Sequence, residues 1–81
     1  MKVITMMKEL KEQGYASVWI KDNKEGYEYA YGLKGYSSID NEEYVERYKD
    51  IFERRILKVE IMPANKDARI TYQIEVWQYD N

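Results

Sequence analysis

Carboxylates and aromatic rings are the side chains that could support chemistry in this sequence, because it contains no histidine and no cysteine. Histidine and cysteine most often titrate near neutral pH, bind transition metals or act as nucleophiles. Enzymes that lack both depend on paired carboxylates, lysine, tyrosine or serine. The sequence instead offers nine tyrosines and two tryptophans, whose large amphipathic rings concentrate at binding surfaces. We therefore expect a binding protein without a cofactor rather than an enzyme.

The carboxylates are densest between residues 40 and 53, where a helix is expected. Glu42 and Glu46 are one helical turn apart, as are Glu43 and Arg47, and paired acids can hold a divalent cation. No calcium-binding or glycine-rich phosphate loop accompanies them, so we expect no metal site. The helix dipole alone favours acids at a helix start. The alternative is an acidic edge, formed by Glu42, Glu43 and Glu46, that binds a basic partner.

The first predicted hairpin carries most of the aromatic residues. Residues 15–21 and 27–33 are β-branched and aromatic runs on either side of the turn-forming residues 22–26. A three-residue loop ending at Gly26 pairs Ile20 with Ala30 and places small aliphatic residues against the helices. The aromatic residues then share the open face of the sheet with Lys21 and with one ring from the last strand: Tyr15, Trp19, Tyr27, Tyr29, Tyr31 and Trp77.

A four-residue loop is the alternative for this hairpin. It would place Tyr27, Tyr29 and Tyr31 in the core, beside Val18 and Ile20. Even on the open face, such rings can have a purely structural role, because cross-strand aromatic pairs stabilise a sheet by about 0.2–1 kcal/mol each without any ligand. The functional interpretation is a platform for a partner, because large exposed apolar patches mark interaction sites.

Two amphipathic helices are expected to position these residues. Val3, Met7 and Leu10 recur at helical spacing, and Gly14 is suited to end that helix in a left-handed conformation. In the second helix, Asp40 is the expected N-cap, with a glutamate at capping-box spacing. An apolar stripe follows, formed by Tyr44, Val45, Tyr48, Ile51 and Phe52.

A second hairpin is predicted from residues 55–62 and 68–79. A four-residue loop at its turn pairs Ile61 with Ile70 and Val59 with Tyr72, and places Leu57 on the same core-facing side. The resulting order, α-β-β-α-β-β, predicts an α+β domain over residues 1–81. Two helices then pack on one face of a four-stranded antiparallel sheet.

Composition bounds the function. The 13 basic and 15 acidic residues nearly balance, whereas nucleic-acid binders usually show a basic stripe. No run of apolar residues is long enough for a membrane span, and the lack of cysteine fits a cytoplasmic protein. Frequent Lys, Ile, Tyr and Asn are typical of AT-rich genomes, which points to a bacterial or phage source.

The sequence thus predicts a protein–protein interaction module, such as a small inhibitor or regulator of a larger protein, with a homodimer as a further possibility. Its partner-binding residues are the aromatic sheet face or the acidic helix start. The alternative function is a single-stranded nucleic-acid binder, in which Trp19, Tyr29, Tyr31 and Trp77 stack on bases. A carboxylate-based enzyme would need two acids that converge in a concave site.

Overall fold

A computed structural model describes residues 1–74 of the chain. Its helices and strands follow the expected α-β-β-α-β-β order, so the α+β class is confirmed. In chain order the elements are α1 (Val3–Glu12), β1 (Ser17–Asp22), β2 (Glu28–Gly32), α2 (Glu42–Arg47), α3 (Lys49–Phe52), β3 (Ile56–Met62), the 3-10 turn η1 (Pro63–Asn65) and β4 (Asp67–Tyr72).

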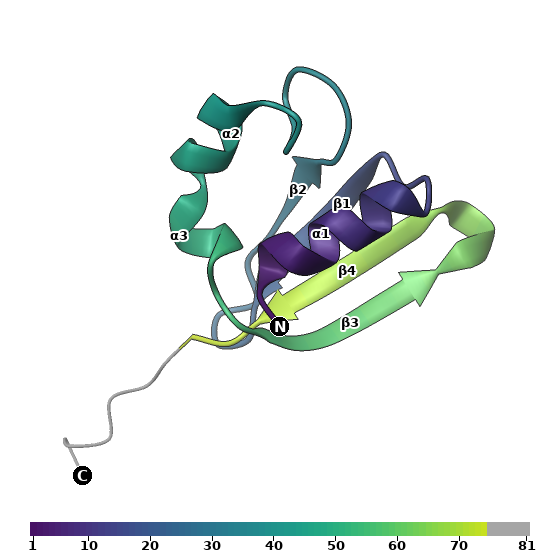
Figure 1. The fold of residues 1–81 in the computed structure, drawn as a ribbon. Coiled ribbons are helices and arrows are strands. Elements are labelled where there is room, and N and C mark those ends of the chain that lie inside the picture. Colours follow the sequence, from purple (N-terminus) through teal and green to yellow (C-terminus); the bar gives the residue numbers. More distant parts are fainter. Residues whose placement is uncertain (75–81) are drawn as a thin grey trace, which may run out of the picture.

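The four strands form one sheet in the order β2-β1-β4-β3, with the helices packed on one of its faces (Figure 1). The two hairpins are antiparallel, as expected. They join through β1 and β4, which run parallel, so the sheet is mixed rather than wholly antiparallel. This arrangement leaves β2 and β3 as the two edge strands.

Helix α1 agrees with its sequence pattern. Val3, Met7 and Leu10 are its buried residues, and they face the sheet as the spacing predicts. Gly14 adopts a φ of 95°, the left-handed conformation expected after the helix end. Within residues 1–74, no helix is long and apolar enough to cross a membrane.

The expected second helix is present in two pieces, α2 and α3, which meet at Tyr48. Its apolar stripe packs on the core as predicted, and Phe52 is fully buried. The ring of Tyr48 meets the rings of Tyr31 and Tyr44 edge to face, with centroids 5.2 and 4.9 Å apart. The break contains no proline or glycine. It falls at a tyrosine, which is a weak helix former and whose ring makes these contacts at the junction.

The register of the first hairpin differs from the favoured prediction and follows the four-residue alternative. Trp19 pairs with Ala30 and Ile20 with Tyr29, so the loop covers residues 23–26. The Asp22 carboxylate accepts hydrogen bonds from the backbone N–H groups of residues 24, 25 and 26, which fixes the longer loop. Gly26 is left-handed as expected, with a φ of 78°.

The second hairpin is also shifted from its predicted register. Val59 pairs with Ile70 and Ile61 with Ala68, so Val59 and Ile61 keep their predicted helix-facing side. A bulge lies between Ile56 and Lys58, and the extra residue, Leu57, is 55% exposed rather than in the core. The predicted core position of Leu57 is therefore wrong.

Candidate functional site

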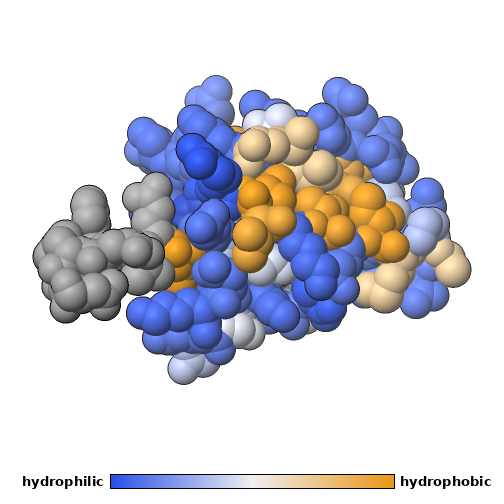
Figure 2. Space-filling model, turned by 90° about the horizontal axis from the view of Figure 1, so that it is seen from below, coloured by the Kyte–Doolittle hydropathy of each residue, from blue (hydrophilic) through white to orange (hydrophobic). Residues whose placement is uncertain are grey.

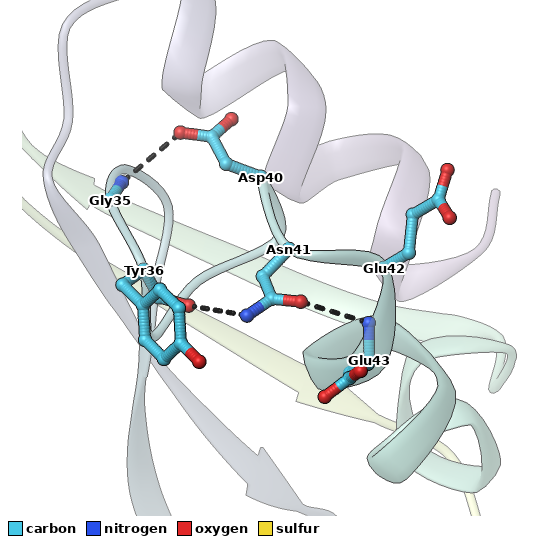
Figure 3. Close-up of a pocket in the computed structure, with 6 residues that line it drawn as sticks. All are labelled: Gly35, Tyr36, Asp40, Asn41, Glu42 and Glu43. Atoms are coloured by element: carbon cyan, nitrogen blue, oxygen red, sulfur yellow. Dashed lines mark hydrogen bonds between the residues drawn. The ribbon is translucent and has the colours of Figure 1, made fainter.

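The loop that joins β2 to α2 borders a shallow hollow. Its volume is about 510 Å³, and its wall is formed by the end of this loop and the first residues of α2 (Figure 3). We call it the Tyr36 hollow and define it by the residues that line it: Gly35, Tyr36, Asp40, Asn41, Glu42 and Glu43.

Hydrogen bonds within the loop fix the shape of this hollow. The Asp40 carboxylate accepts from the backbone N–H of Gly35 at 3.1 Å, and the Asn41 side-chain amide donates to the Tyr36 carbonyl at 3.0 Å. The buried Ser38 hydroxyl donates to the Gly35 carbonyl and accepts from the backbone N–H of Asp40. Because the loop satisfies its own polar groups, its conformation is set before any partner arrives.

The N-cap of α2 is Asn41, not the predicted Asp40. The Asn41 side-chain oxygen accepts a hydrogen bond from the backbone N–H of Glu43 at 3.0 Å. Asp40 lies one position too early for this bond, and its carboxylate instead holds Gly35 and forms an ion pair with Lys11 of α1. Asp40 therefore ties the loop to α1 rather than starting the helix.

Tyr36 is the residue of this site that the sequence analysis missed. Its side chain is 87% exposed, the highest value among the exposed large hydrophobic residues of the described chain. The sequence marked residues 34–38 only as a loop. The available signal was an aromatic residue placed among turn formers, where no strand or helix face can bury its ring.

The predicted acidic residues lie on α2, where the sequence placed them, and Glu42 and Glu43 line the Tyr36 hollow. Glu42, Glu43 and Glu46 are exposed. Within residues 1–74, no cationic group lies within ion-pair distance of any of these three carboxylates. Asp40, by contrast, is neutralised by Lys11. The start of α2 thus presents exposed carboxylates, two of which line the hollow together with the Tyr36 side chain (Figure 3).

The predicted aromatic platform on the open sheet face is not assembled by the described residues. Trp19 lies on that face and is partly exposed, as predicted. Tyr31 is buried in the core and Tyr29 projects on the helix side of β2, because the register of the hairpin is shifted by one residue. Tyr15 is also buried, and it lies before β1 begins. Trp77 lies outside the described residues. The platform prediction is therefore wrong in the placement of Tyr15, Tyr29 and Tyr31.

Tyr29 and Tyr31 instead border a second hollow, on the helix side of β2. It has a volume of about 330 Å³ and is also lined by Ala30, Tyr44 and Tyr48. Burial raises the pKa of Tyr31, and neighbouring Tyr44 adds to the shift. Burial likewise raises the pKa of Tyr44, whose hydroxyl accepts a hydrogen bond from the backbone N–H of Gly32, which opposes the shift.

The other edge of the sheet carries an apolar strip. Figure 2, which views the molecule from the side of β3, shows hydrophobic residues gathered into a band between polar margins. On β3, the large hydrophobic residues Leu57, Ile61 and Met62 are exposed, and Val59 is half-buried. This strip is the third surface that offers contact area to a partner.

Chemically, these surfaces are suited to binding. In the described part of the chain, no group of three or more carboxylates is placed to share a metal ion. The acids of the Tyr36 hollow face an open surface rather than a closed cavity (Figure 3). No family model, curated protein or solved structure matches the chain.

Proposed function

We propose that the chain is a non-enzymatic interaction module that binds a larger protein in the cytoplasm through the Tyr36 hollow. The observation that supports this proposal most directly is the position of Tyr36, whose ring is 87% exposed on a loop held by internal hydrogen bonds. An exposed ring does not contribute the stabilisation that a tyrosine gives when it is buried in the core, so a binding role would explain its position.

A fixed loop lowers the entropic cost of binding. The hydrogen bonds from Gly35 and Asn41 leave few backbone conformations to be lost when a partner binds. Tyrosine is also among the residues that contribute most to protein–protein interfaces, because its large ring has few rotatable bonds. Tyr36 is therefore the expected anchor of the interface.

The charge around the anchor indicates the chemistry of the partner. Glu42 and Glu43 line the hollow together with Tyr36, and Glu46 follows one turn later on α2. None of the three has an ion-pair partner within residues 1–74. A partner with exposed arginine would place its guanidinium against the Tyr36 ring and donate hydrogen bonds to these carboxylates. Opposite charges would also steer the encounter, so binding should weaken with added salt.

The exposed carboxylates argue against the nucleic-acid alternative at this site, since carboxylates repel phosphate. On the open sheet face, Trp19 is flanked by Arg69, but that guanidinium is already paired with Glu28. The described residues thus do not assemble the stacking platform on which that alternative depended.

Affinity capture with the tagged chain tests the proposal, using lysate of the source cell with and without nuclease treatment. Three variants accompany the unaltered chain: Tyr36→Ala, the double variant Glu42→Gln with Glu43→Gln, and Trp19→Ala as a matched control that removes an exposed ring on another face. We expect Tyr36→Ala to weaken binding of the captured protein by about 2 kcal/mol or more, roughly thirtyfold. The charge variant should lose most of its salt dependence.

Three results would count against the proposal. Capture that depends on intact nucleic acid would favour the alternative function. Full retention of the partner by Tyr36→Ala would remove the hollow from the interface. Failure of the unaltered chain to retain any protein above background would leave the interaction module without support.

A further inference from the structure

The edge strand β2 exposes backbone hydrogen-bonding groups at only two of its residues. In its pairing with β1, the N–H of Leu33 donates to the carbonyl of Ala16, and the carbonyl of Tyr27 accepts from Asp22. In an antiparallel pair these groups alternate in direction along the strand. The backbone N–H and carbonyl groups of residues 27, 29, 31 and 33 therefore point toward β1. Those of residues 28, 30 and 32 point away from β1, out of the edge of the sheet.

The outward groups of Gly32 are already satisfied inside the chain. Its N–H donates to the Tyr44 hydroxyl at 3.1 Å, and its carbonyl accepts from the N–H of Ile39 at 3.2 Å. Glu28 and Ala30 have no such partners among residues 1–74. The open part of the edge is therefore a short frame, with one donor and one acceptor at each of these two residues.

This frame is complementary to itself. If two β2 strands lie antiparallel with Tyr29 opposite Tyr29 of the second copy, Glu28 of each strand falls opposite Ala30 of the other. Both pairs then exchange their N–H and carbonyl groups, which satisfies every open group of the frame. A two-fold axis passes between the Tyr29 residues, as a closed homodimer requires.

The side chains fit the same register. Tyr27 and Tyr29 are 62% and 61% exposed and lie on the helix side of β2. In the paired arrangement Tyr27 falls opposite Tyr31 of the second copy. That position adjoins the hollow of about 330 Å³ whose wall includes Tyr31, Tyr44 and Tyr48. Aromatic pairs across neighbouring strands stabilise a sheet. In the dimer, these rings would contact one another instead of water.

Charge does not oppose the pairing, because the Glu28 carboxylate is already bound by Arg69 of its own sheet. Soluble proteins usually protect an edge strand with lysine, proline or a bulge. The edge strand β3 has such protection in Lys58 and in the bulge at Leu57. The β2 segment has none of these three features.

We propose that two copies of this chain pair antiparallel through β2, with Glu28 and Ala30 in the shared ladder and Tyr29 facing its counterpart across the two-fold axis. The proposal concerns a different surface from the Tyr36 hollow, so either can be correct without the other.

A charge-exchange experiment at position 29 tests this symmetry. Sedimentation equilibrium, run from micromolar to millimolar protein, gives the dimer dissociation constant of the unaltered chain and of Tyr29→Lys, Tyr29→Glu and their mixture. Each variant alone places like charges opposite each other, so its dimer should be at least tenfold weaker. The equimolar mixture places opposite charges there and should restore the dimer. Tyr36→Lys serves as a control that should dimerise normally.

Amide hydrogen exchange gives a second readout that does not depend on a variant. The amides of Glu28 and Ala30 should exchange more slowly as the protein concentration rises, while the amide of Tyr36 should not change. A chain that stays monomeric at millimolar concentration would overturn the proposal. So would a dimer that survives Tyr29→Lys but dissociates in Leu57→Lys, because that result would place the contact on β3.

Discussion

The hydroxyl of Tyr44 on α2 accepts a hydrogen bond from the backbone N–H of Gly32 on β2, across a distance of 3.1 Å. This bond joins the second helical segment to an edge strand and satisfies an amide that points out of the sheet. Tyr44→Phe removes the acceptor and keeps the ring, so it should lower the free energy of unfolding by about 1 kcal/mol. Urea denaturation measures this change. Tyr36→Phe, on an exposed ring, should change it by less than about 0.5 kcal/mol.

Gly32 is also a position where no side chain fits. A Cβ at residue 32 would lie 2.1 Å from the Ser37 carbonyl oxygen, so the loop would have to move. We expect Gly32→Ala to destabilise the fold by about 1–3 kcal/mol and to shift the NMR resonances of Ser37 and Ser38. Gly35→Ala meets no atom within 4 Å and should leave those resonances in place, although its φ of 94° carries a strain of its own. Unshifted serine resonances in Gly32→Ala would contradict this account.

The Asp22 carboxylate should make stability depend on acidic pH. Its hydrogen bond from the Glu25 N–H, helped by those from Gly26 and Lys24, lowers its pKa from the usual 3.8, although burial opposes the shift. A lowered folded-state pKa stabilises the fold above the unfolded-state value, and this contribution disappears as the pH falls through the folded-state value. Asp22→Asn should therefore be less stable than the unaltered chain at neutral pH, with a difference that shrinks between about pH 5 and pH 2. Urea denaturation at several pH values measures it, and a constant difference would contradict the assignment.

Tyr31 should limit stability at the alkaline end. Burial, with a contribution from Tyr44, raises the pKa of Tyr31 above the usual 10.0, so the fold favours its neutral form. This contribution is complete below the unfolded-state pKa and is lost as the pH rises through the folded-state value. Tyr31→Phe keeps the ring but cannot ionise, so the midpoint of alkaline unfolding followed by circular dichroism should move to higher pH. An unchanged midpoint would show that another group controls the transition.

The exposure of Leu57 separates the observed register from the predicted one. In the observed register, Leu57→Ala removes a side chain that is 55% exposed, and the cost should stay below about 1 kcal/mol. Ile70→Ala removes a fully buried side chain and should cost about 2–5 kcal/mol. Urea denaturation of both variants provides the comparison. A loss of several kcal/mol from Leu57→Ala would favour the core position that the sequence predicted.

Hydrophobic spacing was sufficient to predict α1 and the order of the elements. Val3, Met7 and Leu10 lie on one helix face whatever surrounds them, since helix geometry is local. Register is a different problem, because one extra loop residue moves every side chain of a strand to the other face. The three hydrogen bonds to Asp22 decided the loop length, and a carboxylate before an Asn-Lys-Glu-Gly turn did not reveal how many amides it would cap.

The candidate site shows the same division between local and long-range information. The exposure of Glu42, Glu43 and Glu46 followed from helix position and charge. The exchange of roles between Asp40 and Asn41 did not, because it depends on an ion pair with Lys11, which is distant in the sequence. The prominence of Tyr36 likewise depends on a loop shape that only the assembled structure defines.

The parallel pairing of β1 with β4 bears on how the chain acquires its structure during synthesis. Trp19 lies beside Arg69 in this pair, so the two central strands of the sheet come from segments that are far apart in the sequence. While a ribosome is still making the second hairpin, β1 has no neighbour on its β4 side, and the backbone N–H and carbonyl groups of that edge stay open to water or to chaperones. Contacts between distant residues also slow folding, since a large loop must close before they form. We therefore expect chains truncated before β4 to be targets of proteases, and the complete sheet to form only after β4 has left the ribosome.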